Sequence, residues 1–174
     1  MKTVITIIGL PGSGKTTLGD MIHKLIKGSR LNADQIRATV SCDLQFAEED
    51  RELQAYRLGA IAALSLYEPP QIVSGKDGYS PGHLNQTSIV DFVCPTERTR
   101  STYDWALRVG NPAPLRKYDI WMNTIRPADS RFPDTAKMFQ PPKGCTLQVD
   151  GYKSAETLAQ IALMVATEVR PDLF

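Results

Sequence analysis

Residues 9–17 read GLPGSGKTT, and this stretch decides the fold. It fits the phosphate-loop pattern G-x-x-x-x-G-K-[ST], whose fixed positions are Gly9, Gly14, Lys15 and Thr16. Glycines let the backbone wrap closely enough for its N–H groups to point at phosphate oxygens, while the lysine neutralises the charge of the β- and γ-phosphates. The threonine hydroxyl is the expected ligand of Mg²⁺. The loop therefore predicts a bound nucleoside triphosphate, held by Gly9, Gly12, Ser13, Gly14, Lys15, Thr16 and Thr17.

The sequence on either side of the loop supports this interpretation. Residues 3–9, TVITIIG, form an apolar run without polar alternation, which is typical of a parallel strand buried on both faces. From Leu18 to Ile26 apolar residues recur at helical spacing, and Gly28 supplies a stop. The alternative is a glycine-rich turn that carries Lys and Thr by chance. The order strand, loop, helix favours the phosphate loop, because the helix N-terminus adds its dipole to the phosphate site.

The composition indicates one domain, residues 1–174, with 42% hydrophobic residues available for a core. A formal net charge of +1 gives no general electrostatic reason to expect a nucleic acid or a membrane as partner, although a local basic patch remains compatible with it. The N-terminal apolar run is too short to span a bilayer and leads directly into the loop, so we expect a cytoplasmic protein. Three widely spaced cysteines and two histidines fit neither a disulfide framework nor a zinc site.

Apolar runs alternate with helical patterns along the rest of the chain. We expect further strands at residues 29–33, 88–95, 118–125 and 145–151, and helices at 47–67, 96–109 and 154–169. The stretch NPAPLR at 111–116 and the Pro-, Gly- and Ser-rich residues 69–87 interrupt this pattern, the latter as an inserted loop of unreadable course. The pattern predicts an α/β fold with a doubly wound, five-stranded parallel sheet, whose ligands lie beyond the C-terminal ends of the strands.

Several polar residues fall near those strand ends. Asp34 can orient an acceptor hydroxyl or a magnesium-bound water, or it can merely cap a short helix, and Arg37 one turn later can bind an anion. Asp91 interrupts an apolar strand, so it either reaches the magnesium site or is a buried carboxylate paired with a cation. For other arginines and aromatic residues the sequence allows two interpretations: they contact a ligand, or the arginines are solvated and the aromatics belong to the core. These residues are Arg51, Arg57, Arg98, Arg100, Phe46, Phe132 and Phe139.

The order of these motifs resembles that of the adenylylsulfate (APS) kinase family of P-loop kinases. LNADQIR at 31–37 is similar to the family's LDGDNVR, with Asn32 in place of the first Asp, and DLQFAEEDRELQAYR at 43–57 resembles DLGFSEEDRAENIRR. FVCP at 92–95 resembles FISP, with Cys94 in place of Ser, and FPDTAKMFQPP at 132–142 aligns with FTGIDSPYEPP.

The resemblance implies an ATP- and Mg²⁺-dependent transfer of a phosphoryl group to the 3′-hydroxyl of adenosine 5′-phosphosulfate, in sulfate assimilation. It implies Lys15 and Asp34 as catalytic residues and Arg37, Phe46, Arg51 and Phe132 as acceptor-binding residues. It carries over Arg57 as well, and dimers are frequent in the family.

Two departures leave the acceptor open. The family's basic lid, of the KGLYKKAR type, has no match before FPDT, where only RPADSR at 126–131 is present, and residues 69–87 have no family counterpart. The alternatives are a kinase for a modified nucleotide, a nucleoside or a polynucleotide hydroxyl, and a nucleotide-binding module that catalyses no transfer.

Overall fold

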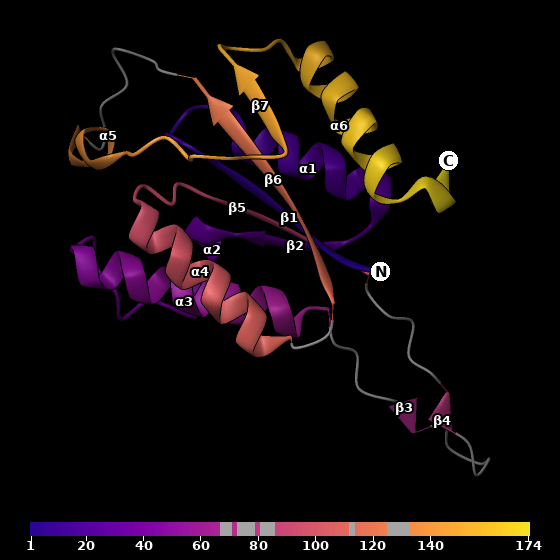
Figure 1. The fold of residues 1–174 in the computed structure, drawn as a ribbon, viewed down its shortest axis with the longest axis horizontal. Helices are drawn as coiled ribbons and strands as arrows, with labels where there is room; N and C mark the ends of the chain where they lie inside the picture. The colour runs from indigo at the N-terminus through magenta and orange to yellow at the C-terminus, as the bar shows by residue number, and fades with distance from the viewer. Residues whose placement is uncertain (67–70, 73–78, 81–85, 112–113, 125–132) are drawn as a thin grey trace.

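Five parallel strands form the sheet at the centre of the molecule (Figure 1), in the spatial order β2-β5-β1-β6-β7. The computed structural model describes residues 1–66, 71–72, 79–80, 86–111, 114–124 and 133–174. The strands of this sheet are β1 (Lys2–Gly9), β2 (Ser29–Asn32), β5 (Thr87–Phe92), β6 (Leu115–Asn123) and β7 (Leu147–Asp150). The predicted five-stranded parallel sheet is confirmed.

Helices cover both faces of this sheet, with α1 and α6 on one side and α3 and α4 on the other (Figure 1). Their bounds are α1 (Lys15–Ile26), α2 (Ala33–Thr39), α3 (Glu48–Leu64), α4 (Glu97–Gly110), α5 (Pro133–Met138) and α6 (Ala155–Val169). Three smaller elements complete the described chain: the antiparallel pair β3 (Gln71–Ile72) and β4 (Tyr79–Ser80), and the 3-10 helix η1 (Pro171–Leu173).

The central strand β1 explains why the apolar run of the sequence lacks polar alternation. Successive side chains of a strand point to opposite faces of a sheet. Ile5 and Ile7 pack into the core beneath α1 and α6, whereas Val4 and Ile8 pack into the core beneath α3 and α4. Both faces of β1 are therefore buried, and this fixes the position of the phosphate loop that follows the strand.

The structure differs from the sequence prediction at several boundaries. Strand β6 begins at Leu115, inside the stretch that we expected to break the chain, because Leu115 continues the parallel register by pairing with Lys2 of β1. Within the expected loop at 69–87 lie the short strands β3 and β4, and β5 already begins at Thr87. Helix α5 lies where we predicted neither a strand nor a helix.

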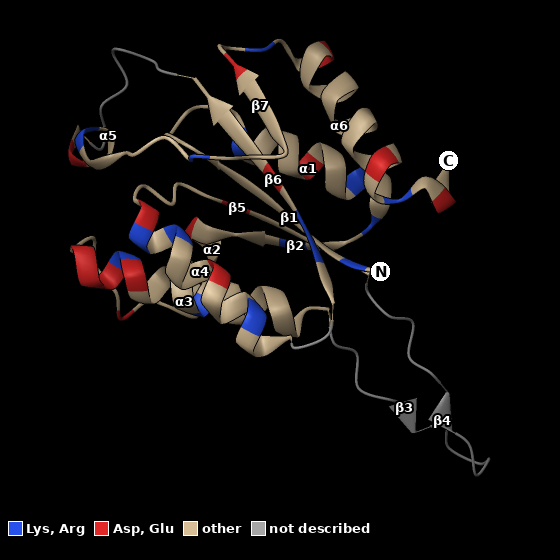
Figure 2. Cartoon of the chain, viewed as in Figure 1, with Lys and Arg blue, Asp and Glu red and all other residues tan. Residues whose placement is uncertain are grey.

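Lys and Arg positions are interspersed with Asp and Glu positions along the described chain (Figure 2). Acidic side chains gather in the first turn of α3, at Glu48, Glu49 and Asp50, where they complement the helix dipole. Among the residues that the structure describes, no helix is both long enough and apolar enough to cross a membrane.

Candidate active site

The phosphate loop joins the C-terminal end of β1 to the N-terminus of α1. Gly9, Gly12 and Gly14 have φ angles of 154°, 76° and 91°, which residues other than glycine rarely adopt. A Cβ atom at Gly9 would also lie 2.6 Å from the carbonyl oxygen of Met122. No side chain of the described residues caps the start of α1, so its first N–H groups are available to a ligand. The loop therefore has the backbone of an anion site.

Two polar side chains in the loop, Lys15 and Ser13, are buried and lack an anionic or hydrogen-bonding partner, respectively, within the described chain. Lys15 is 8% exposed, and its Nζ donates a hydrogen bond to the carbonyl oxygen of Leu10 at 2.7 Å. Burial lowers the pKa of Lys15 to about 8, although the carboxylates of Asp91 and Asp34 oppose the shift. The Oγ of Ser13 is buried and has no hydrogen-bond partner within the described chain. Phosphate oxygens would satisfy both groups, so the loop fits a nucleoside triphosphate.

Thr16 belongs to a hydrogen-bonded cluster at the start of α1. Its Oγ1 donates to Oδ2 of Asp91 at 2.8 Å, and the amide nitrogen of Asn32 donates to Oδ2 of Asp91 at 3.0 Å. Because the Thr16 proton points to Asp91, a lone pair of the threonine oxygen can serve a cation. The described residues contain no group of three metal-binding side chains. Mg²⁺ commonly keeps several waters and uses phosphate oxygens besides one or two protein ligands, so Thr16 suits it.

Asp91 therefore combines features of both roles that its sequence position allowed. It lies on β5, is 2% exposed, and accepts a hydrogen bond from Thr16 through Oδ2. Its other oxygen, Oδ1, forms an ion pair with Nη1 of Arg30 on β2. Arg30 is thus a site residue that sequence reasoning missed.

The position of Arg30 depends on a glycine in α1. The Nε of Arg30 also binds Asp20 at 2.9 Å, so the guanidinium lies against α1. A Cβ atom at Gly19 would lie 2.7 Å from Nη2 of Arg30. The sequence contains both residues, but only the parallel pairing of β2 with β5 brings Arg30 to Asp91.

A cavity of about 360 Å³ opens beside the phosphate loop. Loop residues Gly12 to Thr17 form one wall, and the segment after β7, which includes Tyr152 and Lys153, forms the other. Tyr152 and Lys153 were not predicted as site residues. Their position directly after the last predicted strand was the available signal, because the C-terminal ends of parallel strands share one edge of the sheet.

A second cavity of about 270 Å³ adjoins the first and includes Asp34, Phe46 and Arg51 in its walls. Both cavities are lined by Gly12, Lys15 and Thr16. The two cavities therefore meet at the lysine and threonine of the phosphate loop. This is the arrangement that transfer between two ligands requires, because reacting groups must be held in contact.

Asp34 lies in the first turn of α2 and lines the second cavity. Asn32, not Asp34, caps this helix: its Oδ1 accepts hydrogen bonds from the backbone nitrogens of Asp34 and Gln35, both at 3.0 Å. The alternative interpretation of Asp34 as the helix cap is therefore wrong. Its carboxylate is left available to the cavity.

Two guanidinium groups flank the aromatic ring of Phe46. The Cζ of Arg37 lies 4.9 Å and that of Arg51 lies 5.7 Å from the ring centroid. Arg37 donates to the carbonyl oxygen of Gln45 at 2.6 Å, and Arg51 donates to the carbonyl oxygen of Phe46 at 2.8 Å.

Neither arginine has a carboxylate in ion-pair contact within the described chain. Burial, and then the positive charge of Arg51, lower the pKa of Arg37. The charges of Asp34 and Asp50 act on Arg37, and that of Asp134 acts on Arg51, but no carboxylate of the described chain bonds to either guanidinium. Two neighbouring guanidinium groups with free donors suit an anion.

Other candidate residues lie elsewhere. Arg57 binds the carboxylate of Asp43 with both terminal nitrogens, at 2.5 and 2.8 Å, and is thereby engaged in a structural ion pair. Arg98 is likewise paired, with Glu52 at 2.8 Å. Phe139 lines neither cavity. Phe132, Arg126 and Arg131 lie outside the described residues, as does most of the segment 69–87.

The N-terminal part of the chain matches a known family. Residues 1–73 match the family model of adenylylsulphate kinase. A curated adenylyl-sulfate kinase from Paraburkholderia xenovorans (strain LB400) is 30% identical over 95 residues, which cover 52% of this chain and 52% of that relative. The chain is thus aligned over about half the length of the curated relative. The resemblance that the motifs indicated is confirmed.

Solved structures with the same fold cover almost the whole chain. The Mycobacterium tuberculosis APS kinase CysC, solved in complex with AMPPNP and APS, superposes with a TM-score of 0.69 at 18% identity, covering 96% of this chain and 98% of that chain. A sugar kinase from Janibacter sp. HTCC2649 superposes with a TM-score of 0.63 at 15% identity, covering 99% and 98% of the two chains. At these identities the superpositions establish the P-loop kinase fold and leave the acceptor to the site itself.

Proposed function

We propose that this chain, whose first 73 residues match the adenylylsulphate kinase family, is an ATP-dependent kinase for the 3′-hydroxyl of adenosine 5′-phosphosulfate or a similar nucleotide-like acceptor. The observation that carries the proposal is the meeting of two cavities at Lys15 and Thr16, one of them lined by the phosphate loop and the other containing unpaired guanidinium charge. The resemblance to a structure solved with AMPPNP and APS supports the same assignment.

On the donor side, the loop amides and the N-terminus of α1 bind the phosphates of ATP. Lys15 places its ammonium group against them and gains the anionic partner that its buried position lacks. The Thr16 hydroxyl would hold Mg²⁺, which when bound would supply positive charge next to the transferred phosphoryl group. Asp91 fixes the direction of that hydroxyl through its 2.8 Å hydrogen bond.

On the acceptor side, Arg37 and Arg51 bind the acidic part of the acceptor, and Phe46 offers its ring to a base or ribose. Asp34 lines the same cavity as Lys15, so it is positioned to orient the acceptor hydroxyl and accept its proton. Because the arginines are assigned to the acceptor, loss of either guanidinium should raise the KM for the acceptor far more than the KM for ATP.

The test uses Arg37→Met and Arg51→Met, with Arg108→Met as a matched control on the exposed surface of α4. The KM for adenosine 5′-phosphosulfate should rise about tenfold or more in each site variant, because a charged hydrogen bond is lost. The KM for ATP should stay within about twofold of the wild-type value in the same variants, because these arginines are not assigned to ATP binding. An acceptor KM that changes no more than in Arg108→Met would refute the assignment of these arginines.

A panel of nucleosides, nucleotides and oligonucleotides, assayed by mass spectrometry with the wild-type protein, distinguishes the alternatives. Transfer to another member in preference to adenosine 5′-phosphosulfate would replace the proposed acceptor. Binding of ATP without transfer to any member of the panel would refute the kinase proposal and indicate a nucleotide-binding module.

A further inference from the structure

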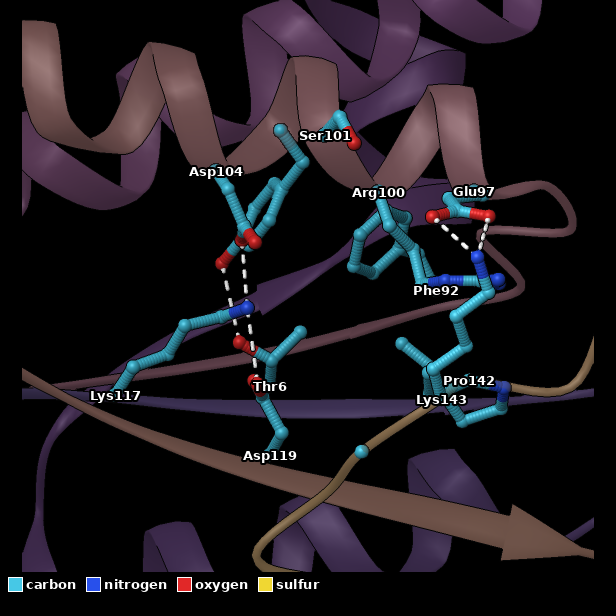
Figure 3. A pocket seen from close by; sticks show the side chains of 13 residues that line it. Thr6, Phe92, Glu97, Arg100, Ser101, Asp104, Lys117, Asp119, Pro142 and Lys143 are labelled. Carbon is cyan, nitrogen blue, oxygen red and sulfur yellow. Dashed lines mark hydrogen bonds and ion pairs between the residues drawn. The ribbon is translucent and has the colours of Figure 1, made fainter.

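A third cavity, of about 250 Å³, lies between the sheet and α4 (Figure 3). Its walls come from α4, from β6 and from residues 142–144. It contains none of the loop residues that bind a nucleotide, and it shares only Phe92 with the acceptor cavity described above. The proposed kinase reaction leaves this cavity without a role.

One end of the cavity carries excess negative charge. The ammonium group of Lys117 lies between two carboxylates, 2.6 Å from Oδ1 of Asp104 and 2.9 Å from Oδ2 of Asp119 (Figure 3). One lysine faces two acids, so one negative charge remains. The Oδ1 of Asp119 is buried without a hydrogen bond to the described residues, and burial raises the pKa of Asp119 despite the lysine. A second cation at this oxygen would be stabilised.

The other end carries excess positive charge. Glu97 is paired there with Lys143 at 2.9 Å, and Arg100 projects beside them (Figure 3). Arg100 donates one hydrogen bond, to the carbonyl oxygen of Cys94 at 3.0 Å, and has no ion pair within the described chain. Two cations thus face one acid, and the guanidinium retains donors for an anion.

Apolar side chains also line the cavity. Ile8 and Phe92 line the cavity, and Pro142 closes it from the loop side. A simple anion would meet Asp119 at one end, and a simple cation would meet Arg100 at the other. A ligand of one sign therefore leaves one end uncompensated, whereas a ligand with opposite charges at its two ends suits both.

We propose that this cavity binds a small zwitterion of the ω-amino acid type, with its ammonium group at Asp119 and its carboxylate at Arg100. The short methylene chain of such a ligand packs against Ile8 and Phe92. Arg100 also holds the carbonyl of Cys94, which lines a pocket of about 80 Å³ beside Asp34 and Arg37. Arg100 and Cys94 therefore connect the bound ligand to the acceptor site.

Isothermal titration of the full chain with 4-aminobutyrate, 5-aminopentanoate and 6-aminohexanoate tests this proposal. Pentylamine and pentanoate, which each lack one of the two charges, and L-leucine, whose charges are adjacent, serve as comparisons. One of the ω-amino acids should bind at least about tenfold more tightly than the comparison compounds, because each of these loses a charged hydrogen bond.

Asp119→Asn and Arg100→Met should each weaken that binding about tenfold or more, while Arg108→Met on the same helix should leave it unchanged. Retained binding of AMPPNP by the variants shows that they are folded and that the phosphate loop is intact. The proposal is overturned if no ω-amino acid binds the folded wild-type protein at roughly 10 mM, or if both site variants bind as the control does.

Discussion

Replacing Arg30 by Met tests how the fold keeps a carboxylate buried beneath the phosphate loop. The side chain of Asp91 is 2% exposed and that of its partner Arg30 is 13% exposed. Removing one partner of a buried ion pair typically costs about 3–5 kcal/mol, because the remaining charge is left uncompensated. Asp91 keeps two other donors, from Thr16 and Asn32. We therefore expect a smaller loss in the free energy of unfolding, about 2–3 kcal/mol.

Thermal and urea unfolding of the nucleotide-free protein measure this loss. For a domain of this size about 2–3 kcal/mol corresponds to a decrease in Tm of roughly 5–10 °C. Asp20→Asn is the matched control, because it removes only the other ion pair of Arg30, whose acidic partner is 55% exposed. Exposed pairs contribute little, so its Tm should fall by less than about 2 °C. If Arg30→Met loses no more than Asp20→Asn, the ion pair does not hold Asp91 and the reasoning fails.

Three further predictions concern Gly19 and Cys94. Gly19→Ala should destabilise the protein by displacing the Arg30 guanidinium, but should cause no further loss in an Arg30→Met background, which double-mutant unfolding measurements check; additive losses would show that the two positions are independent. Burial raises the pKa of Cys94 to about 12, so iodoacetamide at pH 8 should label the exposed Cys42 and spare Cys94, as peptide mass spectrometry can determine. The folded thiol holds its proton where an unfolded one has lost it, so this group's stabilisation should be lost as the pH rises from about 9 to about 12, and Cys94→Ala should lack that component; an identical alkaline loss in the variant would contradict the assignment.

The phosphate loop and its flanking elements could be predicted because their determinants are local. The glycines at 9, 12 and 14 adopt backbone angles that the motif requires, and β1 is buried on both faces as its unbroken apolar run indicated. Asp34 followed from its place after a predicted strand, Phe46 and Arg51 were assigned through the family resemblance, and all three line one cavity in the structure.

The remaining features depend on contacts between distant parts of the chain. Arg30 meets Asp91 across 61 positions, and Arg51 binds the hydroxyl of Thr135 across 84. The spacing of apolar residues within a short stretch of sequence carries no information on pairs that lie so far apart in the chain. The start of β6 at Leu115 has a similar cause, because pairing with Lys2 of β1 overrides the two prolines that precede it. Tyr152 joins the nucleotide cavity only because β7 ends beside the phosphate loop.

The most direct test of the central claim is transfer of phosphate from ATP to adenosine 5′-phosphosulfate in the presence of Mg²⁺, followed by mass spectrometry of the products. The wild-type chain should yield a product one phosphate heavier than the acceptor, and a folded Lys15→Ala variant should yield none, because the γ-phosphate loses its cationic partner. Equal turnover by folded Lys15→Ala protein would contradict the assignment of the phosphate loop as the catalytic centre. Absence of product from the wild-type protein, with ATP bound, would contradict the proposed acceptor.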